Sequence, residues 1–443
     1  MAATDDERTE TQGTELKRAI APRVLLLFVL GDILGTGIYA LVGEVGGEVG
    51  GAIWVALLVA LILAFFTAAS YSELVTKYPS AAGAALYVNK AFKKPGATFM
   101  VTFAVMASGL TSAATAARAF GGDYLSEFIT LPLALVAIGF IAALTFINYL
   151  GISESTKVNV VCTLIEATGL IVIVVIGVAA LIGGDGEPGR AFEFKEGSAV
   201  PLAIMGGAAL SFYALIGFED SVNLAEEAKD PHRSFPRALF GGLLIASVIY
   251  LFVAFTASMV VPTGRLVDSS APLLEVVELG PLSIPTRLFS AIALIAILNT
   301  ALINLIMASR LVYGMSRQGI LPKIFGKIDG RRRTPHIAIL FTAGIAMALI
   351  LTAEVEDLAE TTVLLLLSVF ILVNISVLKL RPDRVDHEHF IAPTALPVLG
   401  VITCLALITQ TEAAVFLRAG ILLVIGLVLW GVNRAVIGET TNR

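Results

Sequence analysis

Charged residues are scarce in this sequence of 443 residues, and their scarcity limits the class of protein. Only 15% of the residues are Asp, Glu, Lys or Arg, whereas 57% are hydrophobic, and the mean hydropathy is +0.89. A soluble domain carries charge on about a quarter of its residues. The composition therefore excludes a soluble globular protein and predicts a protein whose solvent is lipid.

Cysteine and histidine are also rare, which excludes several kinds of chemistry. Cys162 and Cys404 fall inside apolar runs, where they act as small apolar residues and offer no disulfide framework. The four histidines include one close pair, His387 and His389, in a segment that reads as a solvated loop. We therefore expect no metal site, no cofactor, no nucleic-acid partner and no enzymatic activity.

Long apolar runs are what the sequence has in abundance. Runs of about 18 to 26 nearly uncharged residues recur from end to end, and each can cross a ~30 Å hydrocarbon core. The sequence predicts an all-α polytopic protein in the lipid bilayer, with twelve transmembrane helices at 24–42, 53–71, 97–117, 131–150, 158–183, 200–225, 238–261, 288–309, 336–353, 362–379, 391–411 and 413–433.

The distribution of Lys and Arg predicts the orientation, because these residues are retained on the cytoplasmic side in short loops. With the N-terminus inside, 24 of the 30 lie on inner segments, and six lie outside: Arg118, Arg190, Lys195, Arg265, Arg287 and Arg418. An even number of spans then puts both termini in the cytoplasm. The acidic segment 1–22 has no small-residue cleavage site, so we expect no cleaved signal peptide.

Two of the predicted spans are interrupted by small residues. Such residues weaken a helix, and non-helical backbone persists at that depth only where it lines a cavity or is buried in protein. The interruptions lie five spans apart, at Gly31, Gly35, Thr36 and Gly37, and at Gly206, Gly207, Ser211 and Gly217. They are typical of a five-plus-five inverted repeat with a binding site at the midplane. Alternatively, these glycines are close-packing positions between helices.

The predicted organisation follows from this repeat. Discontinuous helices 1 and 6 would begin the two halves, as in LeuT-like transporters. The expected divisions are an N-terminal tail at 1–22, repeats at 23–183 and 184–380, two further spans at 381–434 and a C-terminal tail at 435–443.

Several motifs in order resemble the amino acid–polyamine–organocation superfamily, nearest its cationic amino acid transporter-like branch. Residues 31–37 read Gly-Asp-Ile-Leu-Gly-Thr-Gly, residues 151–155 read Gly-Ile-Ser-Glu-Ser, and residues 212–219 read Phe-Tyr-Ala-Leu-Ile-Gly-Phe-Glu. The inner-loop segments 225–237 and 309–317 also match. The resemblance implies ten core helices in two inverted repeats plus two more, and amino-acid transport.

An unwound first span offers groups for an amino-acid zwitterion. The N–H groups around Gly35, Thr36 and Gly37 would begin the outer half-helix, where the positive dipole end suits a carboxylate. The open carbonyls near Ile33, and those of the sixth span at Tyr213, Ala214 and Ile216, would accept hydrogen bonds from the ammonium. The resemblance implies the same mode, with the aromatic ring of Phe218 closing over the ligand.

Two acids in the membrane are candidates for proton coupling, since ionisable residues there are costly and usually functional. By the resemblance, Glu166 stands where proton-coupled relatives have a lysine, and Asp32 stands where relatives have a small residue. Glu166 either exchanges a proton or forms a hydrogen bond for packing. Asp32 either holds a cation or proton or pairs with a base near the inner gate.

The third span bears on the substrate side chain, because residues 97–117 contain no carboxylate. By the resemblance, Ser108 stands where some cation-handling relatives have a glutamate, which favours small or neutral substrates. Thr300 and Asn304 either line a cation site or form interhelical hydrogen bonds, so sodium coupling stays open.

The sequence thus predicts a secondary amino-acid transporter of the cell membrane, working by alternating access and coupled to protons. The alternatives are an amino-acid exchanger, a carrier of amines, polyamines or cationic amino acids, and, less favoured, a non-transporting sensor. The identity of the amino acid, the direction of transport and the oligomeric state are not predicted.

Overall fold

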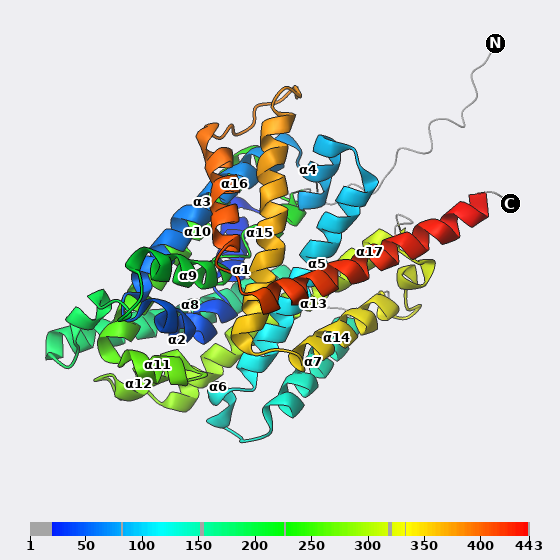
Figure 1. Cartoon of the computed structure of the whole chain (residues 1–443). Coiled ribbons are helices and arrows are strands. Elements are labelled where there is room, and N and C mark those ends of the chain that lie inside the picture. The colour runs from blue at the N-terminus through cyan, green and yellow to red at the C-terminus, as the bar shows by residue number, and fades with distance from the viewer. Residues whose placement is uncertain are drawn as a thin grey trace, which may run out of the picture.

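The computed structural model describes residues 20–80, 83–150, 155–225, 227–317, 321–332 and 334–441, except for the side chains of 155–158 and 433–441. These residues form a bundle of helices around an apolar core (Figure 1). Within the ranges given, β contacts are limited to two isolated bridges, Ile20 with Ala228 and Gly50 with Phe194. The predicted all-α class is confirmed.

The helices that could span a membrane match the twelve predicted positions. In the described part of the chain, nine segments are long and apolar enough: Pro22–Val49, Ile53–Lys77, Pro95–Ser126, Leu133–Leu150, Asn159–Gly183, Pro231–Val260, Thr286–Arg317, Val355–Leu380 and Ala413–Val432. Three shorter apolar helices complete the series: α9 (Val200–Tyr213), α14 (His336–Ile350) and α16 (Ala395–Ile408). The protein is therefore a multi-pass membrane protein.

The remaining helices are either long helices of the bundle or short helices in the connections. The long helices are α1 (Pro22–Ile33), α2 (Thr36–Val49), α3 (Ile53–Lys77), α5 (Pro95–Phe120), α7 (Leu133–Leu150), α8 (Ser155–Gly183), α10 (Pro231–Val260), α13 (Thr286–Arg317), α15 (Val355–Leu380) and α17 (Ala413–Thr441). The connections contain short helices: α4 (Gly83–Phe92), α6 (Asp123–Ser126), α11 (Thr263–Asp268), α12 (Pro272–Leu279), η2 (Pro188–Phe192), η3 (Asp220–Leu224) and η4 (Lys323–Gly326).

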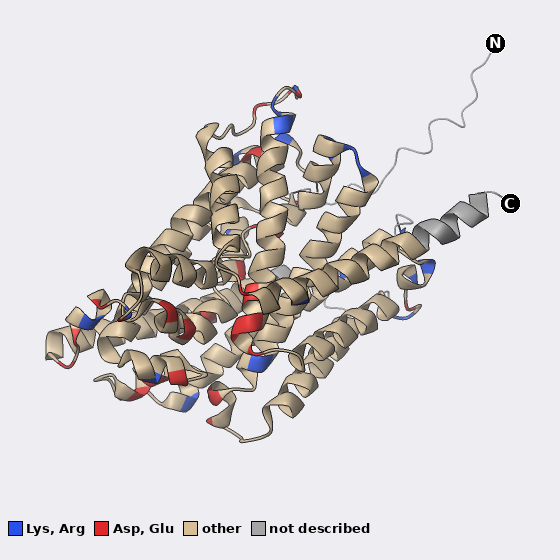
Figure 2. Ribbon diagram, in the orientation of Figure 1, with Lys and Arg blue, Asp and Glu red and all other residues tan. Residues whose placement is uncertain are grey.

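The surface of the bundle fits a lipid environment. Charged residues lie mainly near helix ends and in loops, and long stretches of the helices between them contain none (Figure 2). Large apolar side chains such as Leu340 and Leu417 are 65% and 67% exposed. In water such a surface would be costly, whereas in a bilayer it faces acyl chains while each helix pairs its own backbone groups.

The first transmembrane segment is broken in the middle, as predicted. Helix α1 ends at Ile33, α2 begins at Thr36, and the extended residue Gly35 lies between them. The hydroxyl of Tyr250 on α10 donates to the Ile33 carbonyl at 2.7 Å. This bond supplies a partner to one of the carbonyls that the break releases.

The sixth segment is broken as well. Helix α9 ends at Tyr213, and an irregular turn leads to η3, which begins at Asp220. Within the turn Gly217 has φ +116°, and a Cβ placed there would lie 2.5 Å from the carbonyl oxygen of Asp32. Only glycine accepts this conformation without strain. Because Gly217 has no side chain, the turn can also lie directly against the end of α1.

The neighbouring helices hold the two breaks together. Helix α1 packs on α8 and α10, and α9 packs on α2 and α3, while α5 packs along α13 and α15. The ranges predicted for the two repeats, 23–183 and 184–380, are consistent with these bounds, and that division stays a prediction.

At the end of α3, buried polar groups bind the loop that follows α15. Glu73, only 2% exposed, accepts hydrogen bonds from the Ala392 N–H at 2.9 Å and from Arg381 at 3.2 Å. His387 is exposed, as expected for a solvated loop. Its ring, however, lies closer to that of His232, at 4.5 Å, than to that of His389, at 6.4 Å.

Candidate functional site

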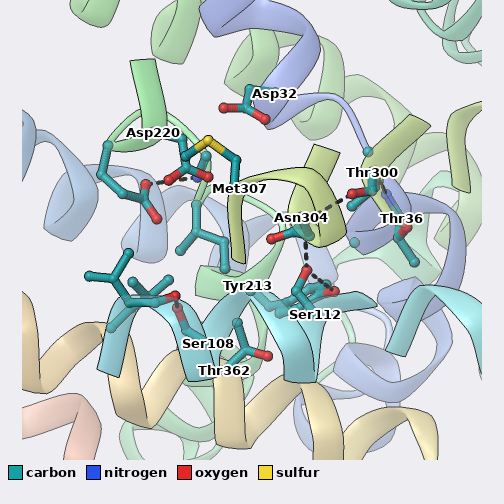
Figure 3. A pocket seen from close by; sticks show the side chains of 18 of the residues that line it. Asp32, Thr36, Ser108, Ser112, Tyr213, Asp220, Thr300, Asn304, Met307 and Thr362 are labelled. Atoms are coloured by element: carbon teal, nitrogen blue, oxygen red, sulfur yellow. Dashed lines mark hydrogen bonds between the residues drawn. The ribbon is translucent and has the colours of Figure 1, made fainter. Parts of the chain in front are cut away.

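A small cavity of about 50 Å³ lies between the two breaks. Its walls come from the α1–α2 break, the turn after α9, and the facing sides of α5, α13 and α15. Figure 3 shows Asp32 and Ser108 on opposite sides of this space. The cavity therefore lies where the broken helices leave backbone groups without helical partners.

The start of α2 contributes both a backbone and a side-chain group. The Thr36 N–H donates to the Thr300 hydroxyl at 3.3 Å. The Thr36 hydroxyl oxygen is buried and has no hydrogen-bond partner among the described residues. Because the first N–H groups of a helix also lack intrahelical acceptors, this end of α2 suits an anionic group.

Gly35 and Gly37 allow the elements around this end of α2 to approach closely. A Cβ at Gly35 would collide with the Thr300 hydroxyl, and one at Gly37 would lie 2.5 Å from the Cα of Ala214. The glycines thus serve close packing and the break together, which were the two alternatives that the sequence left open.

A chain of hydrogen bonds forms one polar wall of the cavity (Figure 3). The hydroxyls of Ser112 on α5 and Tyr213 on α9 lie 3.1 Å apart. Asn304 on α13 donates to the Ser112 hydroxyl at 3.3 Å and to the Thr300 carbonyl at 2.9 Å. Asn304 and Thr300 therefore make interhelical hydrogen bonds and also line the cavity.

Three carboxylates line the same cavity: Asp32, Glu219 and Asp220. Glu219 accepts the Gly217 N–H at 2.8 Å, whereas Oδ2 of Asp32 is buried and has no partner in the described part of the chain. The sequence analysis did not single out Glu219 and Asp220 for the site, so their place in the cavity wall was missed.

Glu166 lies outside the cavity lining, in the interface of α8 with α13. It is fully buried, and Asn299 donates to its Oε1 at 3.2 Å, while its Oε2 has no partner among the described residues. Tyr39 donates to the Glu166 carbonyl at 3.0 Å. Residues 151–154, on which the alignment of Glu166 depends, lie outside the described residues.

The structure brings together most of the residues predicted for substrate binding. The cavity is lined by Ile33, Gly35, Thr36, Gly37, Ser108, Tyr213 and Ile216. Ala214 and Phe218 are not part of the lining. Ala214 packs against Gly37, and the Phe218 ring packs 6.0 Å from that of Tyr71 and 5.8 Å from that of Phe370.

Other lining residues were missed by the sequence analysis. Ser112 lies one turn after Ser108, so helical spacing offered a signal for it. Met307 and Thr362 also line the cavity, but no motif singles them out, because their role depends on how α13 and α15 face the breaks.

Comparison with known proteins agrees with this architecture. Residues 24–430 match the family described as amino acid permease. The chain is 25% identical to the branched-chain amino acid permease BcaP of Bacillus subtilis, over 97% of this chain and 94% of that protein. It is 29% identical to the low-affinity putrescine importer PlaP of Escherichia coli, over 82% of each chain. It is 27% identical to the chloroplastic cationic amino acid transporter 9 of Arabidopsis thaliana, over 72% of this chain and 58% of that protein. With the family match covering nearly the whole chain, the protein belongs to the amino acid permease family.

Proposed function

We propose that this protein is a proton-coupled secondary transporter of small or neutral amino acids. It is a transporter and not an enzyme, and it works by alternating access in the cell membrane with both termini in the cytoplasm. The observation that carries the proposal is the cavity between two broken helices. This cavity includes the start of α2 and the Thr36 hydroxyl, for which the described part of the chain provides no hydrogen-bond partner. Family membership and the similarity to a branched-chain amino acid permease support it.

The cavity offers complementary groups for both ends of a zwitterion. The carboxylate would accept hydrogen bonds from the Thr36 hydroxyl and the first N–H groups of α2. The ammonium would donate to the carbonyls at Ile33 and around Tyr213. The Ile33 carbonyl already accepts one bond from Tyr250, but a carbonyl oxygen has two lone pairs. The small volume favours a short side chain.

For the coupling proton we propose Asp32 and Glu166. Asp32 lines the proposed substrate cavity, whereas Glu166 lies outside its lining and accepts a hydrogen bond from Asn299 on α13. Buried carboxylates of this kind are typical of proton relays in transporters. A proton on Asp32 would reduce the negative charge of the cavity when the substrate carboxylate enters.

The three carboxylates of the cavity favour a second candidate, a carrier of amines, polyamines or cationic amino acids. Asp32, Glu219 and Asp220 would then bind a second ammonium group on the substrate. The printed names of two relatives, a putrescine importer and a cationic amino acid transporter, support this alternative. Exchange of one amino acid for another is compatible with either substrate class.

Binding of matched amino acids and amines to the purified protein separates the two candidates. We expect alanine or valine to raise the unfolding temperature, and the corresponding amines, which lack the carboxylate, to have no effect. Putrescine and lysine test the second candidate in the same assay. Stabilisation by putrescine but by no neutral amino acid would replace the first proposal with the second.

A further inference from the structure

An apolar groove runs between α7 and α14, apart from the substrate cavity. Its volume is about 610 Å³, and its walls include Ala142, Phe146, Ile339 and Met347. The two helices pack against each other and lie side by side at an edge of the bundle (Figure 1). Phe146 is 60% exposed, so the groove opens on the surface that faces lipid.

The groove has the length of one leaflet of the bilayer. It is lined on α14 from His336 to Met347, a rise of about 16 Å at ~1.5 Å per residue. Half of a ~30 Å hydrocarbon core is about 15 Å. The groove therefore reaches from the interface at the start of α14 to the middle of the membrane.

The interfacial end of the groove is polar. His336 and Tyr149 line that end, and the Nδ1 atom of His336 is buried without a hydrogen-bond partner among the described residues. The Tyr149 hydroxyl, by contrast, donates to Asp329 at 3.3 Å. An imidazole nitrogen without a partner at the mouth of an apolar groove indicates a polar group on the occupant.

The loop before α14 adds positive charge at the same end, where Figure 2 shows Lys and Arg. Lys323, Lys327, Arg331 and Arg332 are all exposed, and in the described residues none of them forms an ion pair. Asp329 accepts the backbone N–H groups of Arg332 and Arg331, which hold the pKa of its carboxyl below the ordinary value. The described segment 321–332 thus contains four exposed cations and a single carboxylate, Asp329.

We propose that this groove binds an anionic phospholipid. One acyl chain lies along α7 and α14, and the phosphate meets the imidazole of His336 and the basic loop. The length of the groove matches a single leaflet, and basic pockets between helices at the cytoplasmic interface are suited to anionic headgroups. Positive charge selects phosphatidylglycerol over phosphatidylcholine, whose headgroup carries no net charge.

Native mass spectrometry of the full chain with these two lipids, carrying identical acyl chains, tests the proposal. We expect the protein to bind phosphatidylglycerol about tenfold or more tightly than phosphatidylcholine. Gly344→Phe should abolish this preference, because a Cβ there has nothing within 4 Å and the ring can fill the groove. Gly420→Phe is the matched control, since Gly420 on α17 is equally open and lies outside the groove.

A charge-removing variant and a photoreactive lipid test the proposal without filling the groove. The double substitution of Arg331 and Arg332 by Gln should lower the affinity for phosphatidylglycerol towards that for phosphatidylcholine. Phosphatidylglycerol with a photoreactive group in the chain should label peptides of α7 and α14. Equal affinity for the two lipids, or an unchanged preference in Gly344→Phe, would overturn the proposal. A dimer that Gly344→Phe dissociates would overturn it too, since a second copy would then occupy the groove.

Discussion

The Thr36 hydroxyl gives the most local test of substrate binding. Thr36→Val keeps the size of the side chain and the backbone N–H but removes the buried hydroxyl, which has no hydrogen-bond partner in the described ranges. Loss of one hydrogen bond to a charged carboxylate costs about 1.5 to 3 kcal/mol, so we expect amino-acid affinity to fall about tenfold to a hundredfold.

Isothermal titration with the transported amino acid would measure this loss. Ser290→Ala is the matched control. The Ser290 hydroxyl is also buried, has no hydrogen-bond partner among the described residues, and does not line the cavity. An affinity of Thr36→Val equal to that of the control would remove Thr36 from the proposed site.

Glu166 and Asp32 make separable predictions about proton coupling. Glu166→Gln keeps an oxygen that can accept from Asn299 but removes the titratable proton. We expect exchange of substrate across proteoliposomes to continue, while accumulation driven by an imposed pH difference is lost. Exchange need not cycle the proton, whereas accumulation must.

Asp32→Asn is the comparison for the same measurement, because Asp32 lines the cavity and Glu166 does not. If both variants lose accumulation and keep exchange, the two acids act together. A Glu166→Gln protein that accumulates substrate like the parent would assign Glu166 to packing and leave Asp32 as the coupling residue.

Individual site residues were predictable where their position followed from the effect of glycine on a helix. Glycines in the middle of a span indicated the break, and the break placed Ile33, Gly35, Thr36 and Gly37 at the cavity. Side chains in the irregular turn after α9 were not predictable in the same way. The direction of Phe218 and Glu219 depends on the path of that turn, which the left-handed conformation of Gly217 sets.

The turn after α9 should depend strongly on Gly217. With φ at +116° and a virtual Cβ 2.5 Å from the Asp32 carbonyl oxygen, Gly217→Ala meets both backbone strain and a clash. We expect a loss of at least about 1 kcal/mol of stability, measured as a lower thermal unfolding temperature. Gly139→Ala on α7, where a Cβ has nothing within 4 Å, should change this temperature little. Equal unfolding temperatures for the two variants would contradict the described turn.

The positions of the helices were more predictable than the contacts between helices and distant loops. Apolar length alone located the spans, because a bilayer requires continuous helices. The binding of loop residues Arg381 and Ala392 by Glu73 was not predictable, since the partners lie more than 300 positions apart. No periodic pattern reports such a contact.

The orientation of the protein in the membrane rests on the uneven distribution of Lys and Arg. With Cys162 and Cys404 replaced by Ala, a single cysteine would be introduced at Glu187 or at Arg384. The predicted topology places the first position outside the cell and the second in the cytoplasm. We expect a membrane-impermeant maleimide to label Glu187→Cys in intact cells and Arg384→Cys only after permeabilisation. The reverse pattern would invert the proposed topology.

Transport itself is tested most directly by uptake into proteoliposomes of the purified chain. Labelled small and neutral amino acids, lysine and putrescine would be offered under an imposed pH difference, and separately under a sodium gradient and under no gradient. We expect at least one neutral amino acid to accumulate above its external concentration when the interior is alkaline, and an added protonophore to abolish that accumulation. No accumulation of any of these substrates under either gradient, by protein that is folded and inserted, would contradict secondary active transport.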